Sequence, residues 1–124
     1  MTKPCDLSAV EARRLIGRKI LSPVELLESC INRIEAINPS LNAFVATCYE
    51  RARSEAKAAE DAVMGGTKLG PLHGLPVGIK DIEETEGLRT TYGSLLLKDY
   101  VPEKDEGVVE ELRKAGAIVL GKTN

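Results

Sequence analysis

Two lysines in apolar surroundings and one histidine are the residues of this sequence best placed to do chemistry. Lys80 lies in "VGIKDI", a run that is otherwise typical of a buried strand. A lysine there must reach solvent, pair with a carboxylate such as Asp81, or lose its proton, because burial disfavours the ammonium. The third outcome would create a general base at neutral pH. The local pattern alone favours one of the first two.

The second lysine belongs to "GAIVLGKTN", which fits the phosphate-binding pattern G-x-x-x-x-G-K-[ST]. The matching residues are Gly116, Gly121, Lys122 and Thr123. A phosphate loop needs a flexible turn between its glycines and a helix that begins at the lysine. Residues 117–120 are instead the strand formers Ala-Ile-Val-Leu, and we expect no helix after them. The pattern therefore predicts a buried strand and no nucleotide site.

Other polar residues gather between positions 73 and 94. His73 is the only histidine, so a multi-histidine metal site is excluded, and its place in the turn "GPLHGLP" predicts a structural hydrogen bond. An acidic run could supply paired carboxylates, but it has no second cluster beside it, and we expect a solvated loop. The run consists of Asp81, Glu83, Glu84 and Glu86.

Hydroxyl groups follow in "RTTYGS", at Thr90, Thr91 and Ser94. A hydroxyl becomes a nucleophile only beside a base, and none neighbours these residues in the sequence. We therefore expect them to make turn and capping hydrogen bonds.

The composition excludes several classes of function. The 17 basic residues nearly balance the 19 acidic ones, and the formal net charge is −2. Only Phe44 and three tyrosines are aromatic, which is too few for a base-stacking surface. We expect no nucleic-acid partner, because there is neither a basic stripe nor a stacking platform. The 43% hydrophobic content of 124 residues instead predicts one globular unit with an aliphatic core.

The cysteines indicate neither a disulfide framework nor a zinc site. Cys5, Cys30 and Cys48 are odd in number, widely spaced and never in a C-x-x-C pair, so we expect reduced, packed thiols. No apolar run approaches the ~18 residues that a membrane span needs, and the N-terminus does not resemble a signal peptide. We expect a cytoplasmic protein with no membrane partner, no metal and no cofactor.

Helix signals dominate residues 1–64, which we expect to be a helical segment with one short strand. The S-x-x-E capping boxes at Ser8 and Ser22 predict two helix starts, and Asn38-Pro39 predicts the end of the second helix. A strand is expected over 41–47, and an alanine-rich helix over 49–64 that ends at two glycines.

Residues 65–124 change in character, with a glycine-rich loop and two apolar runs. The run "LPVGIKDI" predicts an interior strand, with Val77 and Ile79 on one face and Lys80 on the other. A helix over 108–115 and the strand 117–120 complete a βαβ unit, whose strands should be parallel with a right-handed connection.

In "GPLHGLPVGIKDIEETEGLRTTYGS" and "ELRKAGAIVLGKTN" the sequence resembles the amidase signature family of serine-dependent amide hydrolases. The resemblance is specific from residue 70 to 124, and "SPVELLESCINRIEAINPSLNAFV" is similar to the family's first helices and strand. It implies an α/β fold: N-terminal helices, then the opening βαβ part of a mixed sheet, apparently truncated. It also implies a small-molecule amide as the substrate of the full-length enzyme.

The resemblance assigns the catalytic base to Lys80. In the family a serine attacks the amide carbonyl, and a second serine, after a cis peptide bond, passes the proton to an unprotonated lysine in "GIKD". Both serines follow the segment that matches "GKTN", so we expect these 124 residues to be inactive alone. Ile82 stands where amidotransferase subunits usually carry asparagine, which favours a free-standing amidase.

Two alternatives stay open. One is a fragment of an amidotransferase A-type subunit. The other is a non-catalytic association module that binds itself or a full-length relative, because "AIVL" would leave an unpaired apolar strand edge.

Overall fold

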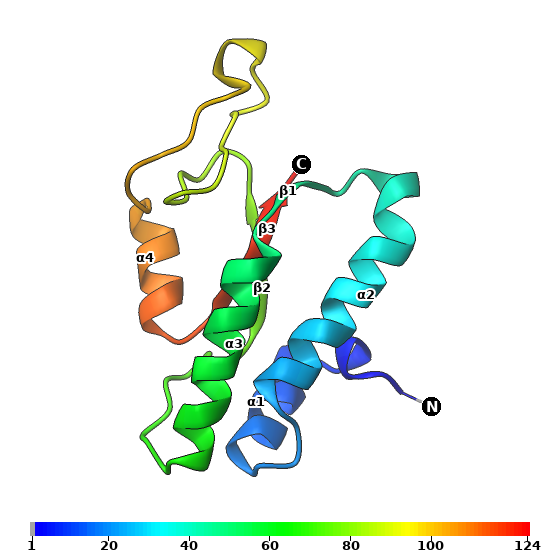
Figure 1. Ribbon diagram of the computed structural model, residues 1–124, viewed down its shortest axis with the longest axis vertical. Helices are drawn as coiled ribbons and strands as arrows, with labels where there is room; N and C mark the ends of the chain where they lie inside the picture. Colours follow the sequence, from blue (N-terminus) through cyan, green and yellow to red (C-terminus); the bar gives the residue numbers. More distant parts are fainter. Residues whose placement is uncertain (1) are drawn as a thin grey trace.

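A three-stranded mixed sheet lies between two layers of helices in the computed structural model, which describes residues 2–124 (Figure 1). Helices α2 and α3 cover one face, and α4 lies on the other, as expected for the opening part of the family's α/β fold. The helices are α1 (Ala9–Gly17), α2 (Pro23–Leu41), α3 (Tyr49–Met64) and α4 (Gly107–Lys114), with 3-10 turns η1 (Pro4–Asp6) and η2 (Leu95–Leu97). The strands are β1 (Phe44–Thr47), β2 (Pro76–Lys80) and β3 (Ile118–Thr123).

The strand order is β1-β3-β2, so the last strand in the sequence is the central one. It runs parallel to β2, which confirms that part of the βαβ prediction, and antiparallel to β1. Two expectations are wrong. The strand that contains "AIVL" is not a sheet edge, because β1 from the first half of the chain pairs with its later residues, Gly121 to Thr123. The strand that ends in Lys80 lies at the edge of the described sheet and not in its interior.

The backbones of β1 and β3 approach so closely at Gly121 that only glycine fits. A Cβ atom there would lie 2.3 Å from the Ala46 carbonyl oxygen. The pairing of β3 with β2 also shifts in register just before Gly121, between Val77 and Gly78 of the partner strand. The glycine of "GKTN" therefore serves strand packing, not a phosphate loop.

Helix α2 begins as predicted and ends later. Ser22 and Glu25 form the reciprocal capping box, but the helix continues past Pro39 to Leu41. The proline removes only the donor to the carbonyl of residue 35, which is at an exposed position where water can replace it. Asn42, with φ of 51°, then ends the helix, and its N–H donates to Asn38.

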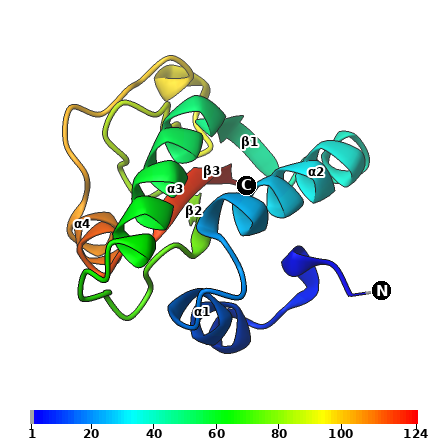
Figure 2. The ribbon, with the colours of Figure 1, turned by 60° about the horizontal axis from the view of Figure 1, so that its bottom comes forward.

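The core is aliphatic and alanine-rich, as the composition predicts. The α3 bounds agree with the predicted 49–64, and Ala52, Ala56 and Ala59 face α2 and β3. A second cluster joins α1 to the N-terminal end of α2 and the C-terminal end of α3. Figure 2 shows α1 outside the sheet layers. Cys30 packs against both clusters, and burial raises the pKa of its thiol to about 11. That placement agrees with the expected packed thiol.

Among residues 2–124, no helix combines the length and the apolar composition that crossing a membrane requires.

We predict that Gly121→Ala destabilises the protein by about 1–3 kcal/mol, because the added methyl group meets backbone atoms that cannot turn aside. The measurement is the free energy of unfolding in urea. Gly107→Ala is the matched control, since a Cβ atom at Gly107 meets nothing within 4 Å. Equal stability of the two variants would contradict the close approach.

Candidate active site

Lys80 is the last residue of β2, and its side chain is exposed. Alternation along the strand is as predicted: Ile79 is buried against α4, and Lys80 lies on the opposite face. Within residues 2–124, none of the ion pairs or side-chain hydrogen bonds involves the Lys80 amine. It reaches solvent at the carboxyl ends of two parallel strands, where open α/β sheets commonly place their ligands.

The neighbouring carboxylate of Asp81 is buried and already hydrogen-bonded. It accepts hydrogen bonds from the Thr91 backbone N–H, at 3.0 Å, and from the Thr91 hydroxyl. The Asp81 backbone joins the same assembly, since its N–H donates to Thr123 and its carbonyl accepts from Tyr92. For Asp81 the expected solvated loop is therefore wrong, and of the two local alternatives for Lys80 the structure shows the one in which the amine reaches solvent.

The fully buried lysine is Lys122, in the central strand. Its Nζ donates to the Glu83 carbonyl oxygen at 2.5 Å and to the Thr90 hydroxyl oxygen at 2.7 Å. Burial lowers the pKa of Lys122, and nearby carboxylates, with Asp81 and Glu83 first, oppose that shift. Sequence reasoning considered this residue only as a phosphate ligand. The signal it missed is that a central strand is buried on both faces, so a lysine within it has no path to solvent.

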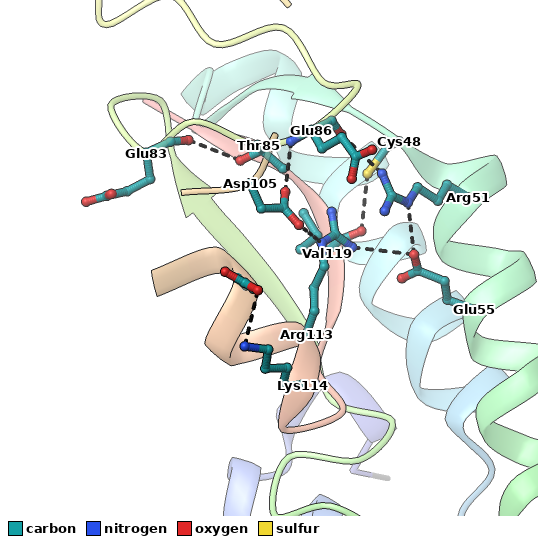
Figure 3. Close-up of polar contacts among 11 residues, drawn as sticks. Cys48, Arg51, Glu55, Glu83, Thr85, Glu86, Asp105, Arg113, Lys114 and Val119 are labelled. Carbon is teal, nitrogen blue, oxygen red and sulfur yellow. Dashed lines mark hydrogen bonds and ion pairs between the residues drawn. The ribbon is translucent and has the colours of Figure 1, made fainter. Parts of the chain in front are cut away.

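The loop that follows β2 is fastened to the helices by arginines (Figure 3). Arg113 of α4 pairs with Asp105 at 2.8 Å and with Glu55 of α3 at 3.4 Å. Asp105 accepts from the Glu86 N–H, and Arg51 donates to the Glu86 carbonyl oxygen. These contacts tie the loop to both helix layers. Within residues 2–124, no three histidine, cysteine, aspartate or glutamate side chains converge on a metal position.

The remaining polar candidates have structural contacts. The His73 Nε2 donates to the Ala59 carbonyl oxygen at 2.9 Å, so the predicted structural role is confirmed. The Ser94 hydroxyl accepts from the Leu96 N–H and caps η2, also as predicted. Thr90 is buried and donates to the Leu88 carbonyl oxygen.

A groove of about 470 Å³ opens at this end of the sheet. Among its polar lining residues are Asp81, Arg89, Thr91, Ser94, Lys98 and Asn124. One of the Arg89 donors is already used, since the side chain donates to the Val45 carbonyl oxygen of β1 at 2.7 Å. Lys80 is not among the lining residues, but its sequence neighbour Asp81 is. Among the described residues at this end of the sheet, the hydroxyl bonded to a carboxylate is that of Thr91, which donates to Asp81.

Comparison with known proteins identifies relatives of this chain. The family described as Amidase matches residues 25–124. The A-type subunit of the glutamyl-tRNA(Gln) amidotransferase of Anaeromyxobacter dehalogenans, strain 2CP-C, is 42% identical over 120 residues, which are 97% of this chain and 24% of that protein.

Solved structures agree with the sequence relatives. A bacterial aryl acylamidase of the amidase signature family superposes with a TM-score of 0.88 at 34% identity, covering 95% of this chain and 25% of that one. A protein from a vestigial complex related to the origins of an s-triazine catabolic enzyme gives a TM-score of 0.91 at 33% identity, covering 95% of this chain and 26% of that one. The chain thus spans about a quarter of the length of these relatives.

Burial of Lys122 makes a prediction about pH. Because its pKa in the folded protein lies below the ordinary value of 10.5, the unfolded chain binds more protons in the window just below pH 10.5. In that window the cost of burying the ammonium falls as pH rises. We expect Lys122→Met to remove this contribution. The free energy of unfolding of the native protein should therefore rise relative to that of the variant as pH rises through this window. The measurement is urea unfolding from pH 8 to 10.5.

Lys114→Met is the control for this titration, since Lys114 is an exposed lysine whose ion pairs raise its pKa. A stability difference for Lys122→Met that is constant across the window would contradict the lowered pKa.

Proposed function

The chain belongs to the amidase family, and on that premise we propose that it is part of an enzyme that hydrolyses carboxylic amides with Lys80 as its catalytic base. The observation that carries the proposal is the difference in contacts between two neighbouring side chains, Lys80 and Asp81. The Lys80 amine is exposed and has no carboxylate partner within residues 2–124, whereas Asp81 is held by Thr91.

The chemistry requires this separation. A carboxylate within about 4–6 Å favours the ammonium form of a lysine, which cannot accept a proton. Asp81 is buried, and its carboxylate accepts from Thr91, with no ion pair to the Lys80 amine within residues 2–124. In the proposed mechanism the neutral form of the Lys80 amine takes the proton that leaves the attacking serine.

The family mechanism assigns the other steps to segments outside these 124 residues. A serine hydroxyl attacks the amide carbonyl while a second serine relays its proton to the lysine, and backbone amides stabilise the oxyanion. The amine or ammonia then leaves with a proton, and water hydrolyses the acyl-enzyme to the acid. The part proposed for residues 1–124 is to supply the base and the first strands of the sheet.

The substrate proposed is a small-molecule amide. The relatives support two kinds of enzyme, since one belongs to an amidotransferase and another is an aryl acylamidase. Ile82, directly after "KD", still favours a free-standing amidase over the amidotransferase.

The test is a chimera in which residues 1–124 replace the matching quarter of the aryl acylamidase. We expect the chimera to hydrolyse an aryl amide, and Lys80→Met to lower its kcat by about 10²–10⁴-fold, the usual contribution of a general base. The 124-residue chain alone should release no product above background.

The control variant of the chimera is Lys114→Met, which changes an exposed lysine of α4. Full activity of the Lys80→Met chimera would exclude Lys80 as the base. Lys80-dependent hydrolysis by residues 1–124 alone would show that the base works without the family's serines.

A second candidate function is self-association through the exposed turn η2. Leu95 and Leu96 are 87% and 96% exposed at the far end of the segment that joins β2 to α4, drawn in yellow in Figure 1. Neighbouring leucines that face water gain free energy when a second copy covers them. This replaces the unpaired edge of β3 as the reason for considering an association module.

We expect Leu96→Ser to lower the fraction of dimer in sedimentation equilibrium, because the substitution removes the most exposed of these leucines. Val10→Ser, at an exposed position on α1, is the control and should leave the dimer fraction unchanged. A native protein that stays monomeric at high concentration would exclude this function.

A further inference from the structure

Lys122 and Lys80 lie on neighbouring strands and on opposite faces of the sheet. In the parallel pairing of β2 and β3, Lys122 is the partner of Ile79, and Thr123 is the partner of Lys80. Paired residues of neighbouring strands share a face, so Lys122 points to the face that Ile79 occupies. The two lysine side chains therefore point to opposite faces, and the contacts that connect Lys122 to Lys80 run through the backbone.

The Lys122 ammonium holds both ends of the loop of residues 83–90. At one end it donates to the Glu83 carbonyl oxygen at 2.5 Å, and at the other to the Thr90 hydroxyl oxygen at 2.7 Å. These two acceptors are seven residues apart in the sequence. One side chain therefore closes the loop onto the central strand.

Each held residue is connected in turn to the end of β2. The Glu83 N–H donates to the Lys80 carbonyl oxygen at 3.0 Å, so the residue that accepts from Lys122 also bonds Lys80. Thr91, next to Thr90, donates to the Asp81 carboxylate from its N–H and its hydroxyl. Two short paths thus lead from Lys122 to Lys80 and Asp81.

We propose that Lys122 is a positioning residue. By holding both ends of the 83–90 loop, it fixes the backbone of Lys80 and the hydrogen bonds between Asp81 and Thr91. The proposal rests on the function assigned to Lys80. A buried ammonium loses its hydration, and here a carbonyl oxygen and a hydroxyl oxygen replace the lost water. An apolar residue would fill the same space without that cost but would remove the bonds that join both loop ends to the central strand.

The test is amide hydrogen exchange of the 124-residue chain, measured residue by residue by NMR. Lys122→Met keeps the apolar stem and removes the donors. We expect exchange of the Glu83 and Tyr92 amides, which bond Lys80 and Asp81, to accelerate at least tenfold. The Ala52 amide in α3 should keep its native rate after correction for global stability.

A second set of variants keeps the proposal testable if Lys122→Met does not fold. Thr90→Val preserves shape and removes the acceptor for Lys122, whereas Thr90→Ser retains it. We expect the Tyr92 amide to exchange faster in Thr90→Val and at the native rate in Thr90→Ser. The cross-peaks of the Lys80 and Asp81 amides should shift in Thr90→Val and return in Thr90→Ser.

Uniformly faster amide exchange in all helices and strands of Lys122→Met would show that Lys122 only stabilises the fold, and would overturn the proposal. Unchanged rates at Glu83 and Tyr92 would overturn it as well. These readouts involve no amide hydrolysis. A chimera whose activity ignores Lys80 would therefore overturn the function of Lys80 while leaving the exchange result intact.

Discussion

The two-sided pairing of β3 is the constraint on which the rest of this structure depends. One strand joins β1, from the first half of the chain, to β2, from the second, and it is buried beneath helices on both faces. Ile118 and Leu120 pack against α2 and α3, while Val119 packs against α4. Without β3 the two helix layers would share no core.

The same sheet places the two lysines in different surroundings. Lys80 follows a hydrophobic run but ends an edge strand, so its amine reaches solvent. Lys122 follows a glycine that resembles part of a phosphate loop, yet it lies in the central strand and is fully buried. Burial of each lysine depends on the face it occupies and on what covers that face, since Ile79 is buried on the same edge strand as Lys80.

Several features were predictable because they depend on neighbours in sequence. The capping box at Ser22 and the bounds of α3 follow from local hydrogen bonding and helical periodicity. Pro39 shows the limit of such rules. The helix tolerates it because the carbonyl that loses its donor is at an exposed position, and because Asn38 still accepts from Asn42. Solvent access is a property of the packed molecule, and no residue type encodes it.

The sequence by itself indicated most of the elements and the family, since caps, periodicity and ordered motifs are local, and through that resemblance it predicted Lys80 as a candidate base. Only the tertiary structure decided that Asp81 bonds Thr91, that Lys122 bonds Glu83 and Thr90, and that β1 covers the free side of β3. These contacts join residues 10 to almost 80 positions apart. Their partners are chosen by which strands pair and which faces are buried, and that choice is made by the whole core at once.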